Sequence, residues 1–287
     1  MFKLSIITIN YNNLKGLQRT VESVINQSWK EFEYIIIDGG STDGSKEYLE
    51  SKKEYLDFCI SQPDKGIYNA MNKGISNATG EYLLFLNSGD HLFYKDALKK
   101  NKDLLIDYDL IYFDLQVVNQ AEFYINKYPE ELRFSDLYYG SLPHPATFIK
   151  KELFKKIGLY DEDLKIVSDW KFFLLALFQF NCTYKKGNDT FATFYLDGVS
   201  SDYNNKKKLI AERQKVLHHY FAPFLLDYEE LNSARIYTGM NRYKMLIEIE
   251  KTNIGRKIVS FFFRFYIVLF LKKNVKEITD RNPKNLF

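Results

Sequence analysis

The chain has 287 residues, of which 46% are hydrophobic and 27% are charged, and this composition predicts a globular protein and excludes a disordered one. The formal net charge is only +3, but residues 251–287 hold nine bases and two acids, a local +7. Residues 1–250 hold the remaining 31 bases and 35 acids, a local −4. A basic tail on a slightly acidic body indicates an anionic partner for the tail alone, either a membrane surface or a nucleic acid.

Strand and helix signals alternate over the first hundred residues. Each strand segment is a short apolar run, typical of a strand buried on both faces, and the helical segments between them are amphipathic. In chain order the strands are Leu4–Ile9, Tyr34–Asp38, Phe58–Ile60 and Glu81–Leu86, and the helices are Leu14–Ile25, Gly44–Leu56 and Ile67–Ala78. This order predicts an α/β fold with a mostly parallel sheet flanked by helices.

The rest of the chain is less regular in the middle and helical at the end. We expect residues 1–205 to form one domain, and residues 206–287 to form a helical C-terminal region. The helices expected there run from 206 to 220, from about 227 to 251 and from 258 to 271.

The cysteines and the N-terminus favour a cytoplasmic protein. Cys59 and Cys182 lie in apolar surroundings without a Cys-x-x-Cys pair, so we interpret them as buried thiols of a reducing compartment. The N-terminus enters a strand at once, without the basic and then apolar layout of a secretion signal.

Polar loops follow the four predicted strands. In a parallel sheet the carboxyl ends of the strands meet at one edge, where ligands bind. The loops are Asn10–Asn13, Asp38–Gly44, Asp64–Gly66 and Asn87–Asp90. The sequence therefore predicts a binding face at this edge.

Two acids on this face are candidates for ligand binding. Asp38 ends a buried strand and needs a hydrogen-bond donor, such as a pyrimidine N–H or a ribose hydroxyl; the alternative is a capped strand-to-helix turn without further function. Asp90 ends the Asn-Ser-Gly-Asp loop, where a carboxylate suits a hard divalent cation that also binds phosphate oxygens. An ordinary turn is the alternative there.

Two more candidates lie in the middle of the chain. Asp169 directly precedes an apolar helical segment, where an acid either caps the helix or acts as a general base. His144 stands between Pro143 and Pro145 and is either structural or a contact for an acceptor or a phosphate.

Taken together, five segments resemble family 2 glycosyltransferases with the GT-A fold, of the bacterial cell-surface polysaccharide type. The resemblance covers roughly Lys3–Phe180, and it is specific because all five segments occur in order at matching spacings. The segments are Leu4–Asn13, Ile35–Gly44, Asp64–Gly74, Gly80–Asp90, and His144–Phe148 leading to Ser168–Trp170.

The resemblance implies an inverting transfer of a sugar from a nucleotide diphosphate to an acceptor hydroxyl, with residues 1–100 as the nucleotide-sugar half and residues 101–205 as the acceptor half. UDP is the expected nucleotide, and Mn²⁺ or Mg²⁺ is the expected cofactor. Matching positions imply that Asn10, Tyr11, Asp38, Asp64, Lys65 and Asn87 bind the nucleotide sugar, that Asp90 binds the metal, that Asp169 is the catalytic base, and that His144 and Trp170 contact the acceptor or a phosphate.

One motif departs from the family pattern, at two of its four positions. The common Asp-Ser-Asp-Asp motif is here Asn-Ser-Gly-Asp, which leaves Asp90 as its single carboxylate. We therefore expect substrate phosphates to supply much of the metal coordination. A catalytically silent, nucleotide-sugar-binding scaffold subunit is the alternative function, and the retained Asp90 and Asp169 favour the enzyme. A nucleotidyltransferase would need a glycine- and arginine-rich phosphate loop near the N-terminus, which residues 10–16 do not provide.

The apolar segment Ile258–Leu271 is rich in Phe and has basic flanks. Its 14 residues fall short of the roughly 20 that span a bilayer, and Arg264 interrupts them. We expect residues 254–273 to lie in a membrane interface, which would place the protein on the inner face of the plasma membrane near a lipid-linked glycan acceptor. The alternative is a helix packed on the same chain or on a second subunit. The segment is too apolar for a nucleic-acid partner.

Overall fold

The computed structural model describes residues 3–119, 122–196, 198 and 202–272. The chain divides into two compact units, Met1–Val216 and Leu217–Phe287. The boundary falls inside a long helix, α8 (Lys206–Gly239), so the first turns of that helix belong to the first unit.

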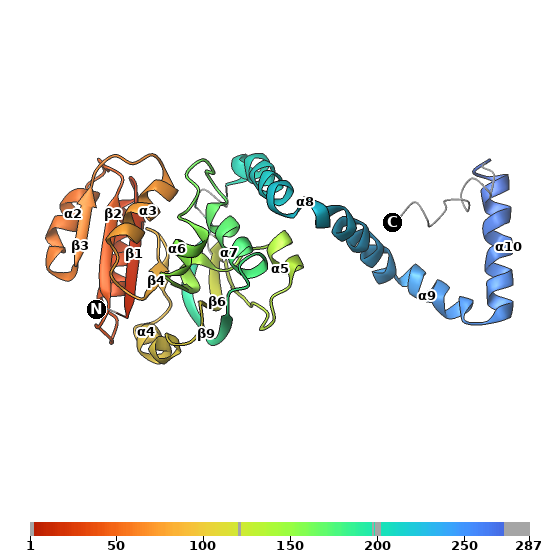
Figure 1. The fold of residues 1–287 in the computed structure, drawn as a ribbon, viewed down its shortest axis with the longest axis horizontal. Helices are drawn as coiled ribbons and strands as arrows, with labels where there is room; N and C mark the ends of the chain where they lie inside the picture. The colour runs from red at the N-terminus through yellow and green to blue at the C-terminus, as the bar shows by residue number, and fades with distance from the viewer. Residues whose placement is uncertain (1–2, 120–121, 197, 199–201, 273–287) are drawn as a thin grey trace. The chain divides into compact units, whose positions relative to one another are not determined.

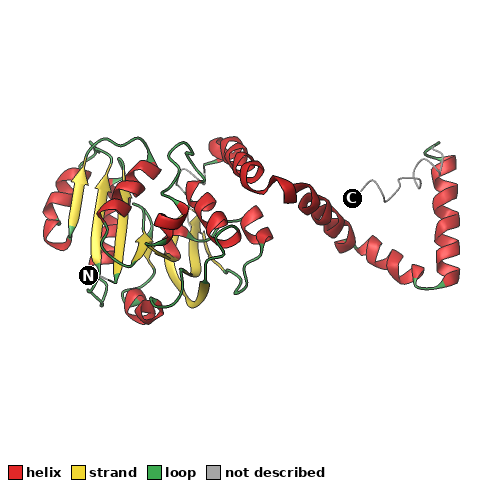
Figure 2. Ribbon diagram, in the orientation of Figure 1, coloured by secondary structure: helices red, strands yellow, loops and turns green. Residues whose placement is uncertain are grey.

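The first unit is built on one nine-stranded sheet with helices packed against it (Figures 1 and 2). Its main path runs β3-β2-β1-β4-β8-β6-β9-β5, and β7 pairs with β6. The strands are β1 (Leu4–Asn10), β2 (Glu33–Asp38), β3 (Phe58–Ser61), β4 (Tyr82–Phe85), β5 (His91–Leu92), β6 (Leu110–Asn119), β7 (Glu122–Asn126), β8 (Thr147–Lys150) and β9 (Tyr184–Tyr195).

The first four strands pair in parallel with one another, as predicted. β1 pairs in parallel with both β2 and β4, and the register places Asn10 beside Asp38 and Ile7 beside Phe85. The carboxyl ends of these strands therefore lie at one edge, and the predicted polar loops follow them there. All residues of β1 and β2 are buried, which explains their unbroken apolar runs.

The middle of the chain is more regular than its sequence indicates. β8 pairs antiparallel with both β4 and β6, and β9 pairs in parallel with β6. β9 was not predicted because its sequence, Tyr-Lys-Lys-Gly-Asn-Asp-Thr-Phe-Ala-Thr-Phe-Tyr, begins with a polar stretch and lacks an apolar run.

Aromatic side chains fill much of the core of this unit. Phe113 stacks on Phe191 at a centroid distance of 4.7 Å, and Phe148 meets the same ring edge-on at 5.1 Å. Part of the high aromatic content is thus explained by core packing.

The helices expected between the first four strands are present in the predicted order, whereas the short helices at Ala97–Asn101, Phe134–Tyr139 and Leu153–Ile157 were not predicted. Among the predicted ones, the segment expected as one helix at Gly44–Leu56 is a shorter helix followed by a 3₁₀ turn at Lys53–Tyr55. The helices are α1 (Leu14–Ile25), α2 (Ser45–Ser51), α3 (Ile67–Asn77), α4 (Ala97–Asn101), α5 (Phe134–Tyr139), α6 (Leu153–Ile157) and α7 (Ser168–Phe178).

Two sequence interpretations were wrong. Cys59 is exposed, because it lies on β3 at the end of the sheet path, where only β2 pairs with the strand; Cys182 is buried as expected. The helix break expected between residues 220 and 227 does not occur, since α8 continues through Pro223 and ends at Gly239.

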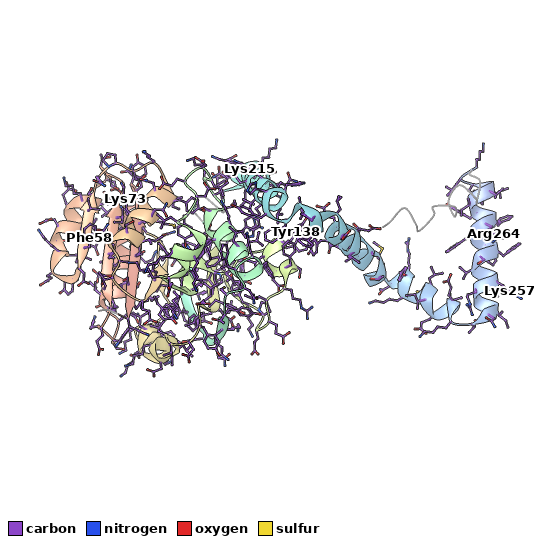
Figure 3. The ribbon with its side chains drawn as sticks, viewed as in Figure 1. Phe58, Lys73, Tyr138, Lys215, Lys257 and Arg264 are labelled. Carbon is purple, nitrogen blue, oxygen red and sulfur yellow. The ribbon has the colours of Figure 1, made fainter. Side chains whose placement is uncertain are left out.

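The second unit continues with α9 (Asn241–Glu250) and α10 (Asn253–Leu269). Thr252 caps α10, since its Oγ1 accepts a hydrogen bond from the Gly255 N–H at 2.9 Å. Lys257 and Arg264 project from this helix (Figure 3). Within the described part of the chain, every helix is too short or too polar to cross a bilayer.

Candidate active site

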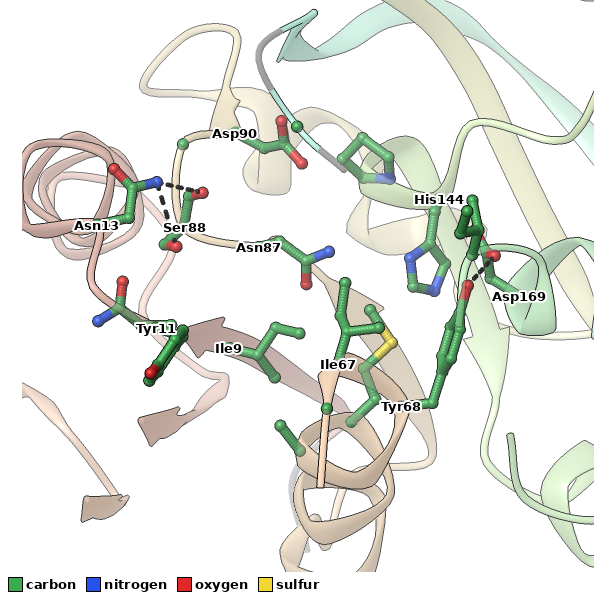
Figure 4. A pocket seen from close by; sticks show the side chains of 18 of the residues that line it. Ile9, Tyr11, Asn13, Ile67, Tyr68, Asn87, Ser88, Asp90, His144 and Asp169 are labelled. Atoms are coloured by element: carbon green, nitrogen blue, oxygen red, sulfur yellow. Dashed lines mark hydrogen bonds between the residues drawn. The ribbon is translucent and has the colours of Figure 1, made fainter. Parts of the chain in front are cut away.

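A cavity of about 610 Å³ lies in the first unit at the carboxyl ends of β1 and β4. Residues of α3, α7, β9 and the 3₁₀ turn His144–Ala146 complete its walls (Figure 4). Seven of the predicted site residues line it: Asn10, Tyr11, Asp64, Asn87, Asp90, His144 and Asp169. Asp38, Lys65 and Trp170 do not.

Two asparagines at the strand ends line the cavity, and each has one unpaired polar atom. Asn10 donates from Nδ2 to Asp38 Oδ1 at 2.8 Å, which leaves its own Oδ1 buried and without a hydrogen-bond partner among the described residues. The Oδ1 of Asn87 is likewise buried and has no hydrogen-bond partner among the described residues. Buried polar atoms are rarely left unpaired, so these two oxygens are suited to meet donors of a bound ligand.

Asp38 is fully buried, and the protein itself supplies its hydrogen-bond donors. Besides Asn10, the hydroxyls of Ser41 and Ser61 donate to it at 2.6 Å, and so do the backbone N–H groups of Gly40 and Ser41. These bonds outweigh burial and lower the pKa of Asp38. The structure therefore corrects the expectation that a ligand must supply the donor: Asp38 fixes the loop behind the cavity.

The Asp64–Gly66 loop forms another wall. Asp64 lines the cavity and accepts a hydrogen bond from the Gly66 N–H at 2.8 Å. Gly66 has φ +120°, a backbone conformation that glycine adopts without strain. Lys65 is exposed outside this lining, because the turn directs its neighbours Asp64 and Gly66 to the cavity instead.

The loop that carries Asp90 is held from α1. The Thr20 hydroxyl donates to the Asp90 carbonyl oxygen at 2.6 Å and accepts from the Gly89 N–H at 3.0 Å. Asn13 donates from Nδ2 to the Ser88 carbonyl oxygen at 3.1 Å (Figure 4). The backbone of the loop is therefore fixed, with Asp90 buried at the cavity wall.

These residues fit a divalent cation only together with a ligand. The described residues contain no group of three His, Cys, Asp or Glu side chains that could hold an ion by themselves. A single carboxylate at a phosphate-binding cavity is nevertheless a common way to bind Mg²⁺, because waters and phosphate oxygens complete the octahedron. Asp90 would hold such an ion.

Asp169 lies in the first turn of α7 and reaches the cavity. Its Oδ1 accepts a hydrogen bond from the Tyr68 hydroxyl at 2.8 Å. Trp170, the next residue, turns the other way, because successive side chains of an α-helix lie about 100° apart. It is 1% exposed and donates from Nε1 to the Leu137 carbonyl oxygen at 2.7 Å, so the expected acceptor or phosphate contact for Trp170 is corrected to a core position.

His144 is a buried part of the cavity wall. Its ring stacks on Phe85 at 4.8 Å, and its Nε2 is 2.9 Å from the Tyr160 hydroxyl. Burial lowers the pKa of His144, while the nearby charge of Asp169 opposes this shift. The imidazole is therefore neutral at pH 7 and acts through hydrogen bonds rather than as a cation.

Tyr68, Lys165 and Tyr195 also line the cavity, and sequence reasoning gave none of them a role. Tyr68 lies inside the recognised Asp64–Gly74 segment, and its spacing of four positions from Asn72, which puts two polar groups on one helix face, was an available signal. Lys165 stands four residues before Asp169. Tyr195 is at the end of β9, with the Arg19 guanidinium 3.7 Å from its ring centroid, and no sequence pattern links these two positions.

A family model described as Glycosyl transferase family 2 matches residues 5–163. The chain belongs to this family. The matched segment carries every predicted donor-side residue and Asp90, whereas Asp169 lies beyond it and is brought to the same cavity by α7.

Curated relatives of this glycosyltransferase include proteins of mycobacteria. The chain is 36% identical over 178 residues to an uncharacterized glycosyltransferase of Mycobacterium tuberculosis (strain ATCC 25618 / H37Rv), covering 60% of this chain and 68% of the relative. It is 28% identical over 211 residues to a PGL/p-HBAD biosynthesis glycosyltransferase of Mycobacterium bovis (strain BCG / Pasteur 1173P2), covering 71% and 77%.

Solved structures support the GT-A fold. S. aureus TarS 1-349 in complex with UDP-GlcNAc superposes with a TM-score of 0.57 at 19% identity, covering 76% of this chain and 73% of that chain. The mannosyltransferase PcManGT from Pyrobaculum calidifontis, in complex with GDP-Man and Mn²⁺, superposes with a TM-score of 0.53 at 14% identity, covering 90% and 83%. The predicted family and fold class are confirmed.

Proposed function

We propose that this glycosyltransferase transfers a hexosyl or N-acetylhexosaminyl group from a UDP-sugar to an acceptor hydroxyl, with inversion, during cell-surface polysaccharide synthesis. The observation that carries this proposal is that Asp90 and Asp169, from the two halves of the first unit, line one cavity. A metal-binding acid and a general base in one cavity are what a direct displacement requires.

In the proposed reaction Asp169 removes the proton from the acceptor hydroxyl as its oxygen attacks the anomeric carbon. The bond from that carbon to the diphosphate breaks as the new glycosidic bond forms. Attack on the face opposite the leaving group inverts the anomeric centre, and no covalent enzyme intermediate is needed.

Asp90 is the proposed ligand of Mn²⁺ or Mg²⁺. Such a cation, when bound, would neutralise charge on the departing diphosphate. The cavity wall holds three carboxylates, Asp64, Asp90 and Asp169, against one lysine, Lys165, among the described residues. A diphosphate in these surroundings needs added positive charge, and this supports a metal-assisted mode of donor binding.

We assign the donor to the strand-end side of the cavity. Asn10 and Asn87 offer unpaired oxygens, Asp64 lines the adjacent loop, and Tyr11 is 66% exposed at the cavity, where its ring is accessible for stacking. Lys65 is proposed to approach the diphosphate from outside the present lining. UDP is the nucleotide that we favour, because the TarS neighbour was solved with UDP-GlcNAc.

We propose a lipid-linked glycan acceptor and a cytoplasmic location on the inner face of the plasma membrane. α10 exposes Phe261, Phe262 and Phe265, each by more than half, and Lys257 and Arg264 lie seven positions apart, about two turns along the helix. Bulky aromatics with basic residues suit a helix that lies in the membrane interface. Residue 273, the last of the expected membrane segment, lies outside the described residues.

The test is release of UDP or GDP from a panel of nucleotide sugars, with and without Mn²⁺. We expect one UDP-sugar to be consumed faster in the presence of Mn²⁺. We also expect Asp169→Asn to keep donor binding and to lower turnover by about 10²-fold or more, the scale of general-base loss. Donor binding without turnover under every condition would instead favour the catalytically silent scaffold subunit.

A further inference from the structure

Helix α3 carries a row of polar side chains that the reaction described above does not use. Asn72 donates from Nδ2 to the Tyr160 carbonyl oxygen at 2.9 Å and accepts at Oδ1 from the Tyr160 N–H at 3.0 Å. Asn69 and Asn72 both donate to the Glu162 carboxylate, at 2.9 and 3.0 Å. Tyr68, at the start of the same helix, donates to Asp169. These bonds join α3 to the segment that leads into α7.

We infer that Tyr68 is a positioning residue that fixes the Asp169 carboxylate in its reactive orientation. The inference rests on the proposed role of Asp169 as general base. Within the described residues, Oδ1 of Asp169 accepts the Tyr68 hydrogen bond, and Oδ2 accepts none. The second oxygen is thus the one presented to an acceptor hydroxyl.

The surroundings of Tyr68 suit this role. Tyr68 is 4% exposed, and burial together with the Asp169 charge raises the pKa of its phenol, so the hydroxyl stays protonated and donates. Its ring packs against Tyr160 at 5.7 Å, and Asn72 holds the backbone of Tyr160 from the next turn of α3. The hydroxyl therefore has little freedom to move away from Asp169.

The same helix also reaches the donor side of the cavity. α3 begins at Ile67, directly after the Asp64–Gly66 loop that lines the cavity. A short helix thus carries the proposed donor loop at its start and the group that orients the base in its first turn. This arrangement sets the base relative to the donor through one rigid element, and a small misplacement of reacting groups is costly to catalysis.

The first test observes Asp169 directly and needs no substrate. Protein labelled with ¹³C at aspartate carboxyl carbons is titrated by NMR, and the signal missing in Asp169→Asn identifies Asp169. A hydrogen bond to a carboxylate favours its ionised form, so its loss makes protonation easier. In Tyr68→Phe, which keeps the ring, we expect this signal to titrate at a pH higher by about 0.5 unit or more.

Tyr112→Phe is the matched control, since the buried Tyr112 hydroxyl donates to the Pro129 carbonyl oxygen at 2.6 Å and does not contact Asp169. It should leave the Asp169 titration unchanged. Tyr68→Leu serves as a second variant if the phenylalanine variant folds poorly, which the same spectra reveal. An Asp169 titration that is the same in wild type and in the Tyr68 variant would overturn the inference.

The second test is hydrolysis of UDP-GlcNAc with Mn²⁺. We expect Tyr68→Phe to lower kcat by between about 10- and 100-fold with the KM for donor unchanged, and to move the acid limb of the pH profile to higher pH. The double variant with Asp169→Asn should be no slower than Asp169→Asn alone. Full activity of Asp169→Asn would contradict the proposed base, whereas an inactive Asp169→Asn with an unaffected Tyr68→Phe would contradict only the positioning role.

Discussion

Individual side chains in the cavity differ in how much the protein already satisfies them. Both carboxylate oxygens of Asp38 accept hydrogen bonds from the protein, and Asp38 does not line the cavity. Asn10 and Asn87 each keep one oxygen unpaired among the described residues. An unpaired buried oxygen is available to a donor from a ligand or a water, whereas the saturated carboxylate of Asp38 supports the loop.

Asp90→Ala is expected to weaken Mn²⁺-assisted UDP binding and to nearly abolish transfer, because Asp90 is the only carboxylate of its loop. The fold should survive, since Thr20 holds the backbone of the loop. Calorimetry of UDP with and without Mn²⁺ measures the effect. Asp103→Ala, at an exposed acid outside the cavity, is the control. Unchanged UDP–Mn²⁺ affinity in Asp90→Ala would rule out the metal role.

His144 makes stability depend on pH. Burial lowers its pKa below the ordinary value, so the unfolded chain takes up this proton first as the pH falls. The stabilisation is therefore complete above the unfolded pKa, about 6.5, and is lost as the pH falls below it. We expect His144→Gln to show a smaller loss of unfolding free energy between pH 7 and pH 5 than the wild type.

Urea unfolding at the two pH values provides the measurement for His144→Gln. His219→Gln changes an exposed histidine and should keep the wild-type pH dependence. If His144→Gln loses as much stability as the wild type on acidification, burial of His144 does not contribute to the pH dependence of the unfolding free energy.

At the scale of elements, α3 packs closely on β1. This packing fixes the Asp64–Gly66 loop, which precedes α3, and Tyr68, which binds Asp169. Gly74 permits this approach, because a Cβ at this position would lie 2.5 Å from Cγ2 of the fully buried Ile7. Both side chains and backbones at this contact are enclosed, so neither element has room to shift without cost.

Gly74→Ala is accordingly expected to destabilise the protein by about 1 to 2 kcal/mol, since overpacking exceeds the gain in helix propensity. Gly239→Ala adds the same methyl group where no atom lies within 4 Å, and it should be neutral or slightly stabilising. Urea unfolding of both variants tests the argument. A Gly74→Ala protein as stable as the wild type would show that α3 can move away from β1.

At the scale of the whole molecule, charge and exposed aromatics are concentrated in the C-terminal region. Residues 251–287 carry the local charge of +7, and α10 exposes a series of large apolar side chains. The cavity is formed by residues of the first unit alone. Donor binding and attachment to a surface are thus assigned to different parts of the chain.

Removal of residues 254–287, of which 273–287 lie outside the described residues, is expected to increase solubility and leave UDP binding intact. Activity on a lipid-linked acceptor should fall, because basic residues near an anionic bilayer contribute about 1 kcal/mol each to attachment. Flotation with anionic and neutral liposomes compares the full-length and truncated proteins.

A full-length variant with Lys257→Glu and Arg264→Glu is the matched control for the truncation, since it keeps the aromatic residues and reverses two charges. It should float less with anionic liposomes. Equal flotation of full-length and truncated protein, or flotation of neither, would show that α10 packs on protein instead.

The sequence by itself determined the alternation of strands and helices, and with it the edge at which the polar loops meet. Buried parallel strands require unbroken apolar runs, and such runs are visible in any single sequence. The five motif segments also sufficed to indicate the family, and they contain Asp90 and Asp169, which both line the cavity. Strands β5 to β9 and the continuous α8 were missed, because strand pairing and helix length there depend on neighbours distant in the chain.

Only the tertiary structure decided which side chains act together. Tyr68 and Asp169 are 101 positions apart and meet through one hydrogen bond. Asp169 and Trp170 are adjacent in sequence, yet Asp169 reaches the cavity and Trp170 lies in the core. Successive side chains of an α-helix point about 100° apart, which separates the two. Hydrogen bonds depend on distance and direction to within fractions of an ångström, and the chain's spacing alone does not specify these.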